Sequence, residues 1–191
     1  MGKERLTAFT DGVVAIVITI MVLELRVPAG PTSGDLLRGL PVLATYVLSF
    51  LYVAIYWNNH HHLLQAVRSV TGGVLWANMH LLFWLSLTPF ATAWMGQNAL
   101  QPVPVATYGG VLIMNGVAYT MLTITLVRHE GRESLLAQAI GRDLKGWGSL
   151  AAYALAIALA FRAPAASMAI YAMVALVWLI PDRRVERVLR G

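Results

Sequence analysis

The sequence predicts an all-α membrane protein whose chain crosses the bilayer six times. Hydrophobic residues make up 58% of the 191 residues and charged residues only 12%, whereas a soluble domain carries about 25% charged residues. Several apolar runs approach the length of about 20 residues that a spanning helix needs. The chain has no cysteine, which excludes disulfides, thiol catalysis and cysteine-ligated metals. Its net charge of +5 is dispersed singly between apolar runs, a pattern that disfavours a nucleic-acid interface.

The predicted spans follow one another along a single domain, residues 1–191. They cover residues 6–27, 36–57, 73–94, 103–127, 147–163 and 164–180. The last two are short, and the break Arg162-Ala163-Pro164 between them predicts a tight hairpin with Arg162 extended toward water. One long kinked helix is the alternative.

Basic residues are distributed unequally between the two sides of these spans. One side carries 11 of the 14 Lys and Arg residues and the other side three: Arg26, Arg38 and Arg162. The larger group comprises Lys3, Arg5, Arg68, Arg128, Arg132, Arg142, Lys145, Arg183, Arg184, Arg187 and Arg190. Because basic loops stay in the cytoplasm, both termini are expected there, with the protein in a bacterial inner membrane. A cleaved signal peptide over residues 1–30 is the competing interpretation, which Asp11 and Glu24 disfavour.

Polar residues converge near the cytoplasmic ends of the first three spans. Asp11 lies in the first span, the run His60-His61-His62 follows the second, and Asn78 and His80 lie in the third. Ionisable groups at membrane depth face protein or water, so we expect a hydrogen-bonded layer that joins these spans. A metal site and a proton relay are the alternatives. Three consecutive histidines on a helix point about 100° apart and cannot all ligate one ion.

The first span carries a stripe, here called the Ile16–Leu23 stripe, made of Ile16, Thr19, Ile20 and Leu23. At about 100° per residue these four side chains share an arc of about 100°, and Asp11 lies about 140° away from Ile16. A stripe of this composition can face lipid, another helix or a pore.

Three motifs carry a resemblance to a known family. The first reads Arg5-x-x-x-Phe9-Thr10-Asp11-Gly12-Val13-x-Ala15-Ile16-x-x-Thr19, the second Tyr56-Trp57-x-Asn59-His60-His61, and the third Asn78-x-x-x-x-Phe83-x-x-x-Leu87-x-Pro89-Phe90. Together they resemble the signature of the transmembrane protein 175 family of potassium channels. The family usually has Phe-Ser-Asp in the first motif, and Thr10 here keeps the hydroxyl.

The resemblance implies a homotetrameric channel of six-helix subunits, with the first helices around a central pore and no Thr-Val-Gly-Tyr-Gly filter. It implies that Ile16 forms the apolar constriction and that Thr19, Ile20 and Leu23 form further pore layers. It also implies a packing network behind the pore, made of Arg5, Phe9, Thr10, Asp11, His60, His61 and Asn78. Permeating potassium ions and lipid are the implied partners, with no cofactor. Animal lysosomal members also conduct protons.

Passive permeation is the function that these features favour. A ring of Ile16 side chains closes a pore by excluding water, and Thr19 hydroxyls replace part of an ion's hydration shell. The structural alternative for Thr19 is a hydrogen bond to the Ala15 carbonyl. Glu24 is expected near the outer mouth, where it attracts cations, unless it pairs with Arg26 or Arg38. The rival functions are a secondary transporter and a proton leak through the Asp/His layer. A membrane enzyme is third, because the sequence has no catalytic motif.

Overall fold

The computed structural model describes residues 2–98, 100–131, 134–140 and 143–179. All the regular elements in this part of the chain are helices. Arg132, Arg142 and the four arginines between positions 183 and 190, which contribute to the predicted charge asymmetry, lie outside the described residues, as does Ile180 at the predicted end of the sixth span.

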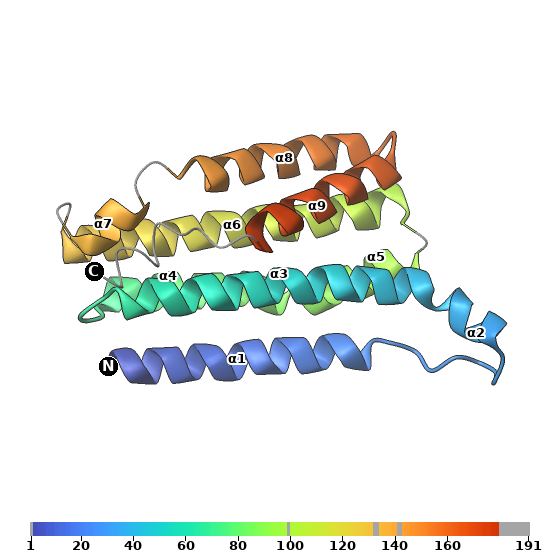
Figure 1. Cartoon of the computed structure of the whole chain (residues 1–191), viewed down its shortest axis with the longest axis horizontal. Helices are drawn as coiled ribbons and strands as arrows, with labels where there is room; N and C mark the ends of the chain where they lie inside the picture. Colours follow the sequence, from blue (N-terminus) through green and yellow to red (C-terminus); the bar gives the residue numbers. More distant parts are fainter. Residues whose placement is uncertain (1, 99, 132–133, 141–142, 180–191) are drawn as a thin grey trace.

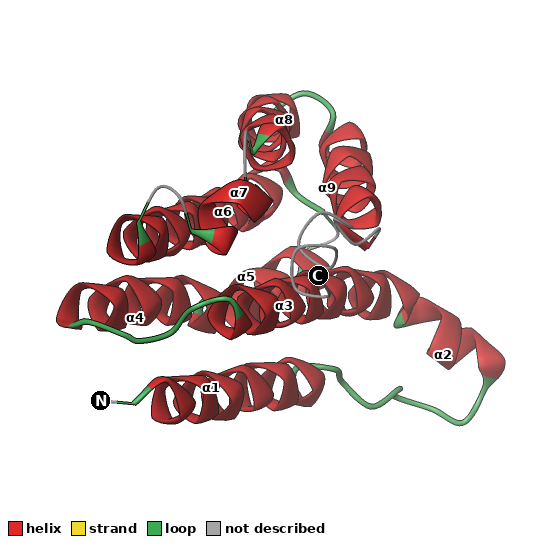
Figure 2. Cartoon of the chain, turned by 60° about the vertical axis from the view of Figure 1, so that its left-hand side comes forward, coloured by secondary structure: helices red, strands yellow, loops and turns green. Residues whose placement is uncertain are grey.

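The helices form three layers (Figures 1 and 2). Helix α1, Lys3–Leu23, lies at one edge. The middle layer contains α3, Leu40–Gln65, together with α4, Gly72–Ser86, and α5, Thr88–Gln97. The opposite layer contains α6, Pro102–Glu130, with α8, Leu144–Ala160, and α9, Pro164–Leu179. Two short helices complete the described chain: α2, Ser33–Arg38, and α7, Leu135–Ile140.

Four helical segments within the described residues are long and apolar enough to cross a membrane. They are α1, α3, the α4–α5 pair and α6. Helices α8 and α9 are apolar but have only 17 and 16 residues, about 25 Å each at 1.5 Å per residue. They run in opposite directions on either side of a break at residues 161–163 (Figure 1). The prediction of six spans stays a prediction, and the break favours a hairpin over one kinked helix.

The second predicted span differs most from the structure. Residues 33–38 form the separate helix α2, and α3 runs from Leu40 to Gln65 instead of from 36 to 57. The polar residues 58–62 lower the mean hydropathy and so end the predicted span early, yet these residues remain helical, and His60 and His61 bond to Asn78 and Gln65. The first span also differs, since α1 ends at Leu23 and residues 24–27 are not helical.

The third predicted span is broken into two helices. Helix α4 ends at Ser86, and α5 begins at Thr88. Pro89 has no N–H and cannot bond to the carbonyl four residues earlier, that of Leu85, so a regular helix cannot continue through this point. Helix α1 contacts α3, α4 and α5, which places it against both halves of the broken helix.

Candidate pore helix and its polar contacts

Helix α1 has one buried face and one exposed face. The buried residues are Leu6, Thr10, Val14, Val17 and Met21, which recur every three or four positions, as one face of a helix requires. Three of them pack with Val53 of α3, namely Val14, Val17 and Met21. The α1 sequence is apolar on both faces, so the packing with α3, α4 and α5 decides which face is covered.

The Ile16–Leu23 stripe lies on the exposed face. Ile16 is 58% exposed and Leu23 80%, and Thr19 and Ile20 are exposed as well. The Thr19 hydroxyl donates a hydrogen bond to the Ile16 carbonyl at 2.9 Å, so its backbone partner is Ile16 and not Ala15. This bond uses the only hydroxyl proton and leaves the oxygen lone pairs available as acceptors.

A buried polar chain fixes α1 against α3 and α4. Asn78 Nδ2 donates to Thr10 Oγ1 at 2.9 Å, and His60 Nε2 lies 2.7 Å from Asn78 Oδ1. All three side chains are buried. Because the amide oxygen of Asn78 can only accept, His60 Nε2 carries the proton in this arrangement. Each of the three helices supplies one member, so the chain sets the rotation of α1 relative to its neighbours.

Asp11 belongs to a second group of contacts, at the surface. Its Oδ1 accepts a hydrogen bond from Trp57 Nε1 at 2.8 Å. The Trp57 ring stacks on His61 at a centroid distance of 6.0 Å, and Gln65 Nε2 lies 2.8 Å from His61 Nε2. A groove of ≈ 320 Å³ between α1 and α3 is lined in part by Asp11 and His61. The expected single polar layer is therefore divided into a buried chain and a surface group.

Arg5 and Phe9 do not lie behind the Ile16–Leu23 stripe, where the expected packing network would place them. Both are exposed, and on a helical wheel each lies about 20° from Ile16. Among the described residues, Arg5 has no hydrogen-bond or ion-pair partner. These two residues therefore extend the exposed face that carries the stripe toward the N-terminus of α1.

Glu24 caps the C-terminal end of α1 and is exposed. The two arginines considered as its partners bind elsewhere: Arg38 Nη1 lies 2.8 Å from Asp35 Oδ1, and Arg26 Nη2 donates to Gln97 Oε1 at 3.3 Å. Within the described chain, the carboxylate of Glu24 has no basic partner.

The remaining histidines point to no metal centre. His80 Nε2 accepts from Trp84 Nε1 at 3.0 Å, and His129 Nε2 lies 2.9 Å from Ser69 Oγ. Among the described residues, no group of three His, Cys, Asp or Glu side chains lies together where it could hold a metal ion. His129 links the end of α6 to Ser69 in the loop before α4, whereas the hydrogen bond of His80 stays within α4.

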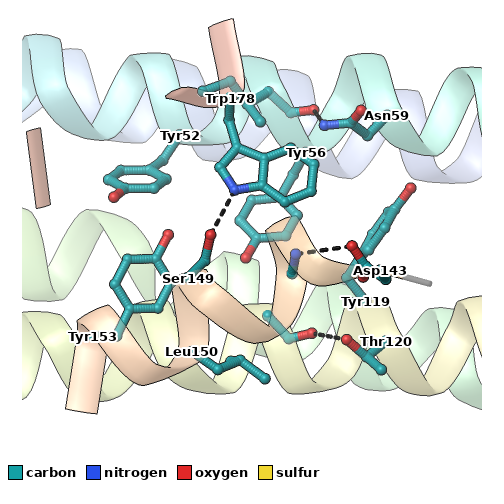
Figure 3. Close-up of a pocket in the computed structure, with 13 residues that line it drawn as sticks. Tyr52, Tyr56, Asn59, Tyr119, Thr120, Asp143, Ser149, Leu150, Tyr153 and Trp178 are labelled. Atoms are coloured by element: carbon teal, nitrogen blue, oxygen red, sulfur yellow. Dashed lines mark hydrogen bonds between the residues drawn. The ribbon is translucent and has the colours of Figure 1, made fainter. Parts of the chain in front are cut away.

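A cavity of ≈ 40 Å³ lies among α3, α6, α8 and α9, away from α1 (Figure 3). Tyrosines from three of these helices line it, Tyr56, Tyr119 and Tyr153 among them, and Trp178 Nε1 donates to Ser149 Oγ at its wall. A volume of this size accommodates about one or two water molecules. Of the three tyrosines only Tyr56 belongs to a sequence motif, because tyrosines within apolar helices have no distinguishing pattern.

Comparisons with known proteins give one consistent result. The family model described as "Endosomal/lysosomal potassium channel TMEM175" matches residues 5–89. A potassium channel of Chryseobacterium sp. (strain P1-3) is 53% identical over 190 residues, which cover 100% of this chain and 99% of the relative. A potassium channel of Streptomyces collinus is 31% identical over 184 residues, which cover 90% of this chain and 89% of the relative.

A solved structure matches the fold. The crystal structure of a lysosomal potassium-selective channel TMEM175 homologue from Chamaesiphon minutus has a TM-score of 0.82 and 25% sequence identity, and the match covers 94% of this chain and 97% of that one. The similarity therefore includes α6, α8 and α9, which the family model does not cover.

Proposed function

This chain belongs to the TMEM175 family, and from that premise we propose that it is the subunit of a potassium-selective channel. Four copies place α1 around a central axis, and potassium ions flow passively along the exposed faces of the four helices. The protein is a multi-pass membrane protein, and we propose the bacterial inner membrane as its location, with both termini in the cytoplasm.

The observation that carries the proposal is the composition of the exposed face of α1. This face presents the Thr19 hydroxyl beside apolar residues on a helix of spanning length, and Arg5 lies on the same face just before the predicted span. Polar groups within a span usually face protein or water and not lipid. Other copies of α1 and a water-filled path provide the surroundings that these groups need.

The stripe supplies two different layers along that path. Four Ile16 side chains form an apolar ring that excludes water and offers an ion nothing in place of its hydration shell. Four Thr19 hydroxyls, one helical turn further along, offer oxygen atoms that replace part of that shell. Ile20 and Leu23 continue the wall toward Glu24, whose unpaired carboxylate raises the local concentration of cations at the mouth.

The buried chain Thr10–Asn78–His60 supports this assignment indirectly. It fixes the rotation of α1, so it determines that Ile16 and Thr19, and not Val17, are left exposed. We propose a positioning role for these three residues and for the contact of Asp11 with Trp57.

Ion flux from proteoliposomes with a potassium gradient tests the function. We expect passive, electrogenic potassium flux that needs no second substrate, from a particle with the mass of four chains. Strict coupling to another ion would identify a transporter, and flux carried by protons alone would identify a proton leak. A monomer that conducts would contradict the tetrameric pore.

Cysteine substitution tests the pore-facing residues, since the chain has no native cysteine. We expect Ile16→Cys to react with a charged, water-soluble thiol reagent and the reaction to change the flux. Leu176→Cys is the matched control, because Leu176 is an exposed apolar residue of α9, in the layer furthest from α1, and its surroundings would be lipid. Reaction at Val17→Cys with an inert Ile16→Cys would show that α1 presents another face to the pore.

A further inference from the structure

We propose that α2 and the start of α3 form a lipid-binding anchor, which inserts Leu36, Leu37 and Leu40 into the headgroup layer of the bilayer. The relevant leaflet is the one nearest the C-terminal end of α1. The inference rests on the proposed function only in taking α1 and α3 as membrane spans, and it requires neither conduction nor a tetramer.

The register between α1 and α3 gives the height of this anchor. Lys3 Nζ donates to the Val67 carbonyl at 2.8 Å, and Trp57 bonds to Asp11, so the two helices are antiparallel with a defined register. Continuing that register places Leu23 about level with residue 45. Leu40 then lies about 7 Å beyond the end of α1 at 1.5 Å per residue. The polar layer on each side of the hydrocarbon core is about 5–7 Å thick, so α2 lies at the level of the headgroups.

The side chains of α2 have the chemistry that this layer binds. Leu36 is 59% exposed and Leu37 60%, and no residue of α2 is buried in the subunit. Leu40, the first residue of α3, is exposed as well. Interfacial helices bury such an apolar face about 5–10 Å into the boundary between headgroups and acyl chains. Arg38, with 81% of its side chain exposed, is paired with Asp35, so the binding is attributed to the leucines and not to charge.

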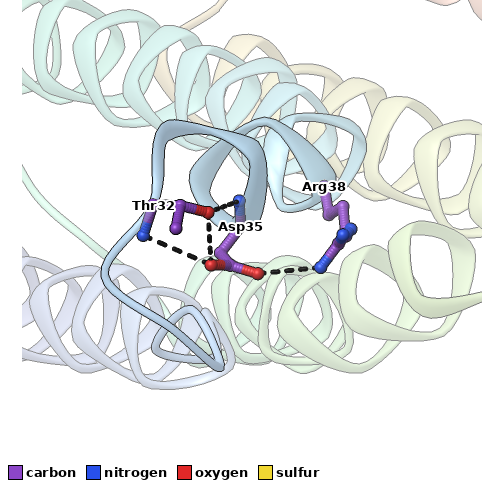
Figure 4. A network of polar contacts seen from close by, with 3 residues as sticks. All are labelled: Thr32, Asp35 and Arg38. Carbon is purple, nitrogen blue, oxygen red and sulfur yellow. Dashed lines mark hydrogen bonds and ion pairs between the residues drawn. The ribbon is translucent and has the colours of Figure 1, made fainter.

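Local hydrogen bonds hold α2 in shape (Figure 4). Thr32 Oγ1 accepts from the Asp35 backbone N–H at 3.2 Å, and Asp35 Oδ2 accepts from the Thr32 backbone N–H at 3.2 Å, which completes a capping box. The ion pair between Asp35 and Arg38 continues the network. A helix of six residues is unstable alone in water, so these contacts present the leucines on a fixed scaffold. Because the two charges of α2 cancel, we expect the binding to depend little on salt.

Site-directed spin labels measure the depth directly, because single cysteines can be introduced into a chain that has none. We expect nitroxides at Leu36→Cys and Leu37→Cys, in phosphatidylcholine and phosphatidylglycerol liposomes, to collide more with oxygen than with a water-soluble nickel chelate. Gly34→Cys is the matched control. It lies about 110° around the helix from the midpoint of the two leucines and should show the opposite preference.

Two results would overturn the anchor. Ready access of the nickel chelate to the labels at both leucine positions would place α2 in water. Immobile labels that neither reagent reaches would place α2 against protein, such as a second copy of this chain. Potassium flux measured on the same liposomes separates the two proposals, since a non-conducting protein with labels at headgroup depth contradicts the channel and leaves the anchor intact.

Discussion

Helix α1 and the layer formed by α6, α8 and α9 are both apolar, but of the two regions only the layer has glycines covered by a neighbouring helix, namely Gly109 and Gly116. A Cβ atom on Gly109 of α6 would overlap the Tyr171 hydroxyl and lie 2.7 Å from Ile157 Cγ1, and one on Gly116 would lie 2.9 Å from Leu150 Cδ2. On α1, a Cβ atom on Gly12 would meet nothing within 4 Å. Small residues in membrane helices serve close packing.

The difference indicates which contacts are complete within one chain. In the α6–α8–α9 layer, Gly109 and Gly116 are already covered by neighbouring helices, whereas Gly110 and Gly148 are open, so part of the close packing of this layer is complete within one chain. On α1 a glycine, an arginine and a hydroxyl share an uncovered face. We therefore expect the α6–α8–α9 layer to contribute mainly to the stability of the subunit and α1 to contribute mainly to the assembly of several copies. The following predictions test this difference.

The largest loss of stability is expected from Gly109→Val. The added side chain collides with Tyr171 and Ile157, and overpacking of this kind costs about 3 kcal/mol or more. Thermal unfolding in detergent should show a midpoint well below that of the unmodified protein. Gly110→Val is the control, because a Cβ atom on Gly110 meets nothing within 4 Å. Equal midpoints for the two variants would contradict the close packing of α6.

Asn78→Ala is expected to destabilise the subunit next most strongly. It removes the partner of the buried Thr10 hydroxyl and His60 Nε2, at a net cost of about 1–3 kcal/mol. Asp11→Asn should have a much smaller effect on unfolding, since an amide oxygen still accepts the Trp57 hydrogen bond at the surface. If Asp11→Asn unfolds more readily than Asn78→Ala, the surface group is the stronger link between α1 and α3.

Gly12→Leu should separate assembly from folding. Its side chain enters empty space in the single chain but would enter a shared interface in the tetramer that we propose. We expect the apparent dissociation constant of the tetramer to rise about tenfold, equivalent to about 1.4 kcal/mol, with secondary structure and subunit stability unchanged. Native mass measurement across a dilution series provides the readout. A tetramer that persists unchanged would mean that this part of α1 faces no other copy.

Thr19→Val is expected to have the smallest effect, confined to ion preference. Valine keeps the shape and removes the oxygen, which lowers the preference for potassium over sodium by about two- to tenfold if the hydroxyl contributes one ordinary hydrogen bond or ion contact. Reversal potentials under bi-ionic conditions measure the ratio. An unchanged potassium-to-sodium ratio together with a changed conductance would mean that the Thr19 side chain affects the width of the pore and not its ion preference.

Much of this arrangement could be predicted from the sequence, for identifiable reasons. The stripe followed from helical periodicity, and it is exposed within the subunit, while its place in a pore stays a prediction. A polar link between the first three spans followed from the similar depth of Asp11, the histidines and Asn78, but Thr10 and not Asp11 makes the bond to Asn78. The break at Leu87 was missed although Pro89 signals it, because the apolar run is continuous through that point.

Other features had no signal in a single sequence. Trp57 is the last residue of the predicted second span, whereas eight further residues of α3 follow it and its indole N–H bonds to Asp11. Arg5 and Phe9 were assigned to the network by resemblance, but the turn of α1 places them on the exposed face. Which helix face is covered depends on tertiary packing, and α1 is apolar enough on both sides for either face to be buried.

The break between α4 and α5 has a mechanical consequence for α1. If α4 and α5 formed one continuous helix, a tilt of that helix would displace the whole length of α1. Instead α1 contacts two separate helices joined at Leu87, where Pro89 removes a hydrogen bond that would otherwise resist bending. The half of α1 that carries Asp11 and the half that carries Thr19 are therefore supported by different helices, and the angle between α4 and α5 sets the alignment of one half of the proposed pore wall with the other.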